Sequence, residues 1–178
     1  MRWVKLALVL ECVGCEADIH GTGSLYVYNG TQDAVTVEIK GPTERSVSLE
    51  PRLGQMIDKA VAGTYQATIK KRSGGTTDTV SAQVVRERLT VINVGAAACF
   101  ARTDVAGMYR KDRRPVVRLQ VYSGVSVFQI PEAIDVPPGE MLPKHRSKGP
   151  YAFQRLSVVP CSIIKEDMNV EDYVHREP

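Results

Sequence analysis

The sequence has few of the residues from which most active sites are built. It contains three histidines and four cysteines in 178 residues. The histidines, His20, His145 and His175, are isolated, and the cysteines offer no second ligand pair with the spacing of a zinc site. There is no G-x-S-x-G motif and no cysteine with a convincing histidine partner. We therefore expect no metal site, no cofactor and no enzymatic activity.

The sequence also has little net excess of either charge sign. The chain has 23 Lys and Arg against 20 Asp and Glu, which gives a net charge of +3. This is well short of the concentrated positive charge of a dedicated nucleic-acid-binding protein, so we expect no nucleic-acid partner. Two local basic clusters stand out, namely Arg110, Lys111, Arg113 and Arg114, and Lys144, His145, Arg146 and Lys148. Both lie beside Pro or Gly, as solvated loops do, although the first is a candidate contact for an anionic polymer such as lipopolysaccharide.

Long hydrophobic runs are absent, and the longest apolar run near the N-terminus is Leu6–Leu10. It is too short for a permanent membrane span, which needs about 20 residues. Arg2 and Lys5 precede it, and after Glu11 the segment Cys12-Val13-Gly14-Cys15 follows. The order of basic, apolar and small residues is typical of an export signal.

The segment Val13-Gly14-Cys15 resembles the lipobox of bacterial lipoproteins. In that family the cysteine is acylated and becomes the mature N-terminus. The resemblance implies a signal peptide over 1–14, lipidation of Cys15, a tether over 15–23 and a place in the periplasm, anchored to the outer membrane. The alternative is that residues 3–14 form an ordinary buried strand or helix of a cytoplasmic protein.

Residues 24–98 alternate between strand-like runs and turn signals at short intervals. Asn29-Gly30 is a strong hairpin signal and predicts that the strands on either side of it pair. Short strands at this spacing, without helical periodicity, predict an all-β fold of the immunoglobulin-like β-sandwich class. The expected strands cover 25–28, 34–39, 46–49, 61–69, 79–85 and 89–94, with Val35, Val37, Ile39, Tyr65, Ala67, Ile69, Val80, Ala82, Val84, Leu89 and Val91 facing the core.

Residues 99–178 are less regular and predict a loop-rich C-terminal extension packed on the sandwich. Their apolar residues look too scattered to build a second core. Prolines divide the stretch into loops. The expected elements are strands over 116–122, 125–128 and 153–159 and a short helix after Asn169.

Three segments resemble poorly characterised bacterial envelope proteins. The run 62–65 contains their "GTY" strand, 89–94 with Cys99-Phe100 matches a segment in which an aromatic residue follows cysteine, and 127–134 matches a proline-containing tail. The resemblance implies a fold without an assigned activity.

Cys99 and Cys161 remain once Cys15 is acylated and Cys12 is removed with the signal. In an oxidising periplasm they are candidates for a disulfide. The alternative is two buried thiols that act as small hydrophobic side chains.

We expect a membrane-anchored periplasmic lipoprotein that serves as a structural or interaction subunit of an envelope assembly. Edge strands of a sandwich offer unpaired backbone groups to such a partner. The alternative is a module that binds glycan or another small ligand through exposed aromatic side chains, for which the candidates are Tyr26, Tyr28, Tyr109 and Tyr122.

Overall fold

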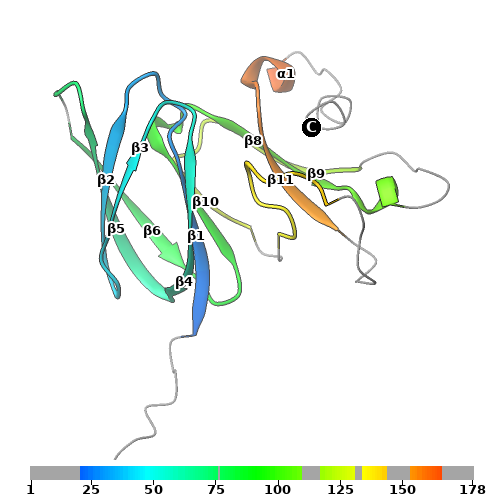
Figure 1. The fold of residues 1–178 in the computed structure, drawn as a ribbon, viewed down its shortest axis with the longest axis horizontal. Helices are drawn as coiled ribbons and strands as arrows, with labels where there is room; N and C mark the ends of the chain where they lie inside the picture. The colour runs from blue at the N-terminus through cyan, green and yellow to red at the C-terminus, as the bar shows by residue number, and fades with distance from the viewer. Residues whose placement is uncertain (1–20, 76, 110–116, 131–133, 144–152, 166–178) are drawn as a thin grey trace, which may run out of the picture.

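The computed structural model describes residues 21–75, 77–109, 117–130, 134–143 and 153–165 (Figure 1). The predicted signal, most of the tether and the helix predicted after Asn169 lie outside these ranges. Within them the chain is mainly β, as predicted, and its strands form three sheets. The helices in the described ranges have at most five residues, and none has the length and apolar character needed to cross a membrane.

The first sheet has the strand order β10-β7-β1-β4 and the second has the order β3-β2-β5-β6. The third sheet has the order β11-β8-β9. In chain order the elements are β1 (Thr22–Tyr28), β2 (Val35–Lys40), β3 (Arg45–Leu49), β4 (Gly54–Val61), β5 (Gly63–Lys71), β6 (Asp78–Val84), β7 (Leu89–Asn93), η1 (Val94–Ala96), β8 (Cys99–Asp104), η2 (Ala106–Tyr109), β9 (Val117–Tyr122), β10 (Val127–Ile130), β11 (Gln154–Val159) and α1 (Cys161–Lys165).

The first and second sheets pack face to face around the main core (Figure 1). Side chains alternate across a strand, so every second residue of β2, β5 and β6 points into this core. The buried set includes most of the predicted positions, namely Val35, Val37, Ile39, Tyr65, Ala67, Ile69, Ala82 and Val84, while Val80 is partly buried against them. These two four-stranded sheets form the sandwich.

The other face of the first sheet is buried too. All five residues of β7 are buried, and Leu89 and Val91 face away from the main core. They pack in a second core with residues of the third sheet such as Phe100 and Leu156. Leu89 and Val91 face a core, as predicted, but it is the second core, because alternation alone does not show which face of a doubly covered sheet a residue occupies.

The C-terminal extension is better packed than its sequence suggested. It contributes Phe100, Phe128, Ile130 and Leu156 to the second core. It also has a small third core of its own on the far face of the third sheet, formed by Cys99, Ala101, Val105, Val159 and Ile163. The expectation that its apolar residues are too scattered for a core was therefore wrong.

The sandwich also takes a strand from beyond residue 98, where the sequence analysis ended it. β10 pairs with β7 in the first sheet, in antiparallel register from Val127↔Ile92 to Ile130↔Leu89. This strand was expected in the extension because the apolar residues of 99–178 look too scattered for a second core. Pairing with β7 supplies the hydrogen bonds that local sequence does not show.

The predicted hairpin at Asn29-Gly30 is wrong, because β1 and β2 lie in different sheets. β1 pairs with β4 antiparallel and with β7 parallel, whereas β2 pairs with β3 and β5. Asn29 and Gly30 begin the crossing between the sheets. A glycine fits there because a Cβ on Gly30 would overlap the backbone nitrogen and Cβ of Ala98.

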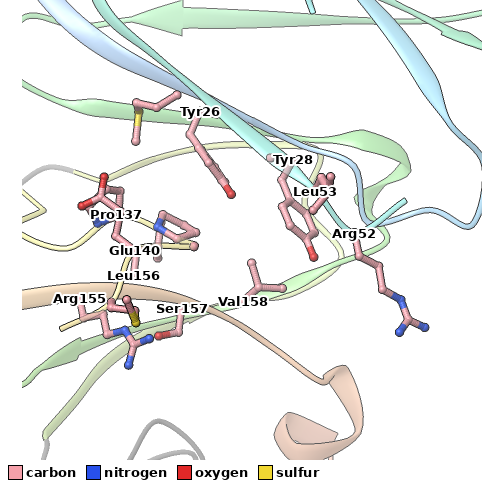
Figure 2. Close-up of a pocket in the computed structure, with 15 residues that line it drawn as sticks. Tyr26, Tyr28, Arg52, Leu53, Pro137, Glu140, Arg155, Leu156, Ser157 and Val158 are labelled. Atoms are coloured by element: carbon pink, nitrogen blue, oxygen red, sulfur yellow. The ribbon is translucent and has the colours of Figure 1, made fainter. Parts of the chain in front are cut away.

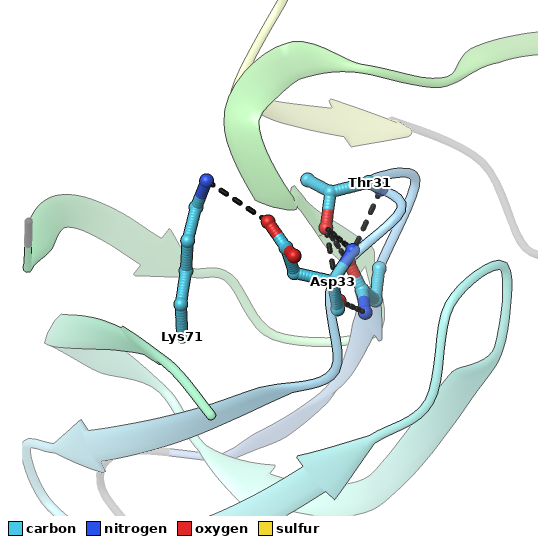
Figure 3. Close-up of polar contacts among 4 residues, drawn as sticks. Thr31, Asp33 and Lys71 are labelled. Carbon is cyan, nitrogen blue, oxygen red and sulfur yellow. Dashed lines mark hydrogen bonds and ion pairs between the residues drawn. The ribbon is translucent and has the colours of Figure 1, made fainter. Parts of the chain in front are cut away.

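The crossing is held by the buried side chain of Asn29. Its amide donates to the carbonyls of Asp33, Leu49 and Glu50, at 2.8, 3.3 and 3.2 Å. Its oxygen accepts hydrogen bonds from the backbone N–H and the hydroxyl of Thr31, at 3.1 and 2.7 Å. Figure 3 shows Thr31 and Asp33 in this network, with an ion pair from Lys71 to Asp33 at its exposed side. One amide thus ties the end of β1 to the turn that follows β3.

Two strands, β4 and β8, have no counterpart in the sequence analysis. β4 is a mostly exposed edge strand, and its register with β1 shifts between Gly23 and Leu25, where Lys59 has a φ of +55°. β8 has the opposite property, since its first five residues are all buried. Neither strand alternates between apolar and polar residues, which is the signal that sequence reasoning uses.

We predict that Asn29→Ala lowers the free energy of unfolding by about 2–3 kcal/mol, because it leaves buried carbonyls without a donor. Denaturant unfolding measures the change. Thr36→Ala is the control, since its hydroxyl makes an exposed 3.4 Å contact with Ser48, and it should cost less than about 0.5 kcal/mol. Equal midpoints for the two variants would contradict the role of Asn29.

Candidate binding groove

A groove of about 670 Å³ lies between the first and third sheets. One wall is formed by β1 and by the chain from Arg52 to Met56, and the other by β11 and the loop 137–141. Figure 2 shows Tyr26 and Tyr28 extending from β1 toward β11, with Val158 facing them from the opposite wall. The groove exists because the third sheet covers the first sheet over β7 and β1 and leaves the β4 side open.

The two tyrosines that line the groove are almost completely buried. They are two residues apart on β1 and so lie on the same face, with ring centroids 6.3 Å apart. Tyr28 also packs edge-to-face on Phe100 at 5.6 Å. Tyr26 is 5% exposed and Tyr28 is 8% exposed, so little of either ring is open to a ligand. A sugar that stacks on a flat aromatic face finds no such face here.

Gly54 makes room for the Tyr26 ring. This glycine pairs with Tyr28 across the β1–β4 ladder, and Tyr26 pairs with Met56. A Cβ on Gly54 would overlap the hydroxyl and the ring carbon of Tyr26 that bears it. The absence of a side chain at position 54 therefore sets the position of Tyr26 and the depth of the groove at that point.

The rim of the groove carries apolar and charged side chains together, since Arg52 and Glu140 are exposed there beside Leu53 and Met141. The described residues include three exposed large hydrophobic side chains, and two of them, Leu53 at 56% and Met141 at 77%, line this groove. The third, Val125, is 40% exposed and lies elsewhere. Exposed hydrophobic side chains that gather beside a concave surface mark a site of interaction, whereas single scattered ones need no explanation. Methionine in particular adapts its shape to different partners.

The groove continues at both ends. Toward the start of β1 it meets a hollow of about 440 Å³, which shares Met56, Pro137 and Glu140 with it. Toward the end of β1 it meets a hollow of about 500 Å³, which shares Tyr28, Arg52 and Val158. The furrow thus follows the seven residues of β1, a length of roughly 23 Å at the rise of a strand. Its shape suits an extended chain better than a compact small molecule.

Burial raises the pKa of the Tyr26 hydroxyl far above its ordinary value of 10.0, and the nearby Tyr28 adds to the shift. The neutral phenol is therefore the form that the folded protein prefers. At the groove this hydroxyl acts as a neutral hydrogen-bonding group and not as a base at physiological pH.

The structure joins Cys99 and Cys161 in a disulfide, with their Cα atoms 5.2 Å apart. The bond connects the start of β8 to the start of α1. The two free thiols that the sequence analysis kept as an alternative are thus not what the structure contains. The disulfide borders the furrow at its distal end.

The other predicted site residues lie outside the described residues or outside the groove. Cys15 and the basic cluster Arg110, Lys111, Arg113 and Arg114 fall outside the described ranges. Tyr109 packs edge-to-face on Phe153 and donates a hydrogen bond to the carbonyl of Pro143. Tyr122 stacks on Phe128 with centroids 4.1 Å apart. Of the four tyrosines proposed for ligand binding, the structure brings Tyr26 and Tyr28 to the groove.

The rim of the groove was not indicated by the sequence, although the strand expected over 153–159 corresponds to β11, which forms part of one wall. Leu53 and Met141 are single apolar residues in loops, and such residues carry no periodic signal. Within the described ranges, no three His, Cys, Asp or Glu side chains gather in a way that could hold a metal ion.

We predict that Tyr26 contributes to the alkaline loss of stability. Its pKa is higher in the folded state than in the unfolded state, so its contribution is fully present below pH 10 and is lost as the pH rises, because the unfolded chain then releases the proton first. The free energy of unfolding should fall less between pH 8 and pH 11 in Tyr26→Phe than in the parent chain. Equal losses in the two chains would contradict this role.

Comparison with known proteins gives no indication of the function of this chain. No family model, no curated protein and no solved structure matches this chain. The arrangement of the groove and of the strand edges beside it therefore carries the functional argument.

Proposed function

We propose that the protein is a bacterial envelope lipoprotein, anchored through an acylated Cys15, that acts as an interaction subunit by binding a partner protein in the groove. The observation that carries the proposal is the gathering of Leu53 and Met141 on the rim of the furrow between the first and third sheets. Apolar side chains exposed beside a long concave surface lower the free energy of a complex when a partner covers them.

A protein partner is favoured over a glycan or another small ligand. The alternative depends on exposed aromatic side chains, and Tyr26 and Tyr28 are buried. The furrow is also elongated along β1, as a bound segment of polypeptide requires. The basic cluster at 110–114 stays a predicted contact for an anionic polymer.

The place in the envelope is supported by two features of the chain. The order of basic, apolar and small residues before Cys15 is typical of lipoprotein signals. The disulfide between Cys99 and Cys161 suits an oxidising compartment such as the periplasm, since cytosolic thiols are kept reduced. Two four-stranded sheets around one core support an immunoglobulin-like sandwich as the finer class of fold.

The proposed anchor lies close to the proximal end of the furrow. Six residues separate Cys15 from Thr22, the first residue of β1, and seven residue steps span at most about 25 Å when fully extended. Thr22 itself lines the hollow at the proximal end of the furrow. The tether would therefore hold this end near the membrane surface, where the partner would also be an envelope protein.

The anchor is tested by the intact mass of the protein purified from its native membrane fraction. We expect a chain that begins at Cys15 and carries the added mass of acyl chains. The variant Cys15→Ser should lose this modification and leave the membrane fraction. A parent chain that begins at Met1 without lipid would refute the lipoprotein assignment.

The groove is tested by photo-crosslinking in the same membranes, with p-benzoylphenylalanine in place of Met141. We expect a discrete protein adduct from this position. The same group in place of Val125, another exposed apolar residue that does not line the groove, is the matched control and should give none. Adducts of equal yield from both positions would indicate nonspecific contact and contradict the proposal.

The disulfide is expected to stabilise the fold by about 4 kcal/mol, because it closes a loop with a sequence separation of 62 residues. The double variant Cys99→Ser with Cys161→Ser should lose this amount in denaturant unfolding. Added reductant should destabilise the parent chain equally and leave the double variant unchanged. A parent chain that resists denaturant equally well with and without reductant would contradict the expectation.

A further inference from the structure

β11 pairs with β8 along one edge, and the start of its other edge, called the outer edge below, is paired too. Val136 forms a parallel bridge with Arg155. The N–H of Val136 donates to the carbonyl of Gln154 at 3.1 Å, and the N–H of Leu156 donates to the carbonyl of Val136 at 3.0 Å. The segment around Val136 therefore acts as a short strand on this edge, next to the groove.

A proline interrupts this pairing. In a parallel ladder the next donor along the added segment is two residues further on, and it would donate to the carbonyl of Leu156. That residue is Pro138, which has no N–H. The chain also turns away at this point, since Glu140 donates its N–H to the carbonyl of Pro137 and Gly139 has a φ of +86°. The chain cannot continue the strand that it has started.

The rest of the edge is left open toward the groove. Backbone groups of alternate residues face the same side of a strand, so the carbonyl of Leu156 and the N–H and carbonyl of Val158 point outward with the N–H of Leu156. Among the described residues, no hydrogen bond to these three groups is seen. Leu156 and Val158 both line the groove.

Two other sheet edges, those of β4 and β3, carry protection against pairing, but this part of β11 does not. β4 carries a register shift and the exposed charges of Asp58 and Lys59, which are common devices against pairing with another chain. β3 begins with the exposed Arg45. The open part of β11, from Leu156 to Val159, has no charged residue, no glycine and no proline. An apolar edge without such protection is a template for another strand.

We infer that an extended segment of the partner adds to the outer edge of β11 as a strand, in line with the segment around Val136. Its N–H donates to the carbonyl of Leu156, and its carbonyl accepts from the N–H of Val158. Its side chains alternate, so those on one face pack against Tyr28, Leu53 and Met141, and these positions select apolar residues. This inference rests on the proposed function of the groove and specifies how the partner is recognised.

The test compares two substitutions at one position, both made in the full-length lipoprotein that carries p-benzoylphenylalanine at position 141. Val158→Pro removes the outward N–H, and proline is tolerated on an edge strand when the missing N–H faces outward. Val158→Ala removes a similar part of the side chain but keeps the N–H. We expect Val158→Pro to lower the yield of the adduct about tenfold, and Val158→Ala to lower it less than about threefold.

A second pair of variants is independent of any disturbance to β11. Pro138→Ala gives the chain its own donor for the carbonyl of Leu156, and we expect it to compete with the partner and lower the adduct yield. Pro137→Ala is the matched control, because the N–H of residue 137 would face away from β11. Thermal unfolding of each variant shows whether the fold is retained. If Val158→Pro does not fold, the comparison of Pro138→Ala with Pro137→Ala tests strand addition by itself.

The outcomes separate the two proposals. No adduct from position 141 in the parent chain overturns the groove as a binding site and, with it, the added strand. An adduct whose yield is unaffected by both Val158→Pro and Pro138→Ala leaves the groove in place and overturns strand addition. An adduct whose partner proves to be a second copy of this chain overturns a separate partner protein. Mass spectrometry of the crosslinked peptide should find a segment with apolar residues at alternate positions.

Discussion

The first sheet must be covered on both faces, and the rest of the structure depends on this requirement. β7 carries five buried residues in succession, and β1 places Leu25 and Val27 on one face and Tyr26 and Tyr28 on the other. A sheet with two apolar faces is stable in water only when a layer covers each of them. The second sheet covers one face, and the third sheet, built from the C-terminal part of the chain, covers the other. The C-terminal part is thus a structural necessity for the sandwich.

Local patterns predicted those parts of the fold in which one face meets solvent. β2 and β5 alternate cleanly, so their positions and their inward residues were recognised from the sequence. β8 is buried on both faces and β4 is exposed along most of its length, so neither alternates. Asn29-Gly30 has the composition of a tight turn, but the buried amide of Asn29 bonds to carbonyls about 20 residues away, and tertiary contacts of that kind are invisible to a local pattern. The same limit explains why Tyr26, Tyr28 and Tyr122, which were candidates for exposed aromatic side chains, are buried in the structure, and why the rim of the groove was missed.

The groove exists because the third sheet covers only part of the first sheet. The third sheet has three strands and the first has four, so the β4 side of the seam is left with β11 and the loop 137–141 as its only opposing surface among the described residues. Tyr26 and Tyr28 close the bottom of this gap with buried rings, and Gly54 gives Tyr26 the space to do so. What remains open is a strand edge and a rim on which Leu53 and Met141 lie beside the charged Arg52 and Glu140. The depth of the groove is thus set by packing within the fold.

The disulfide gives this open edge a fixed position. Cys99 begins β8 and pairs with Val159, the last residue of β11, while Cys161 follows β11 after Pro160. The covalent bond therefore fastens the end of β11 to the strand beside it, close to the unpaired groups of Leu156 and Val158. A strand that is held rigid loses little conformational entropy when another strand is added to it, and this raises the affinity that a few backbone hydrogen bonds can provide. In a reducing compartment the same edge would lose this restraint, so recognition at β11 would be strongest in the oxidising environment proposed for the protein.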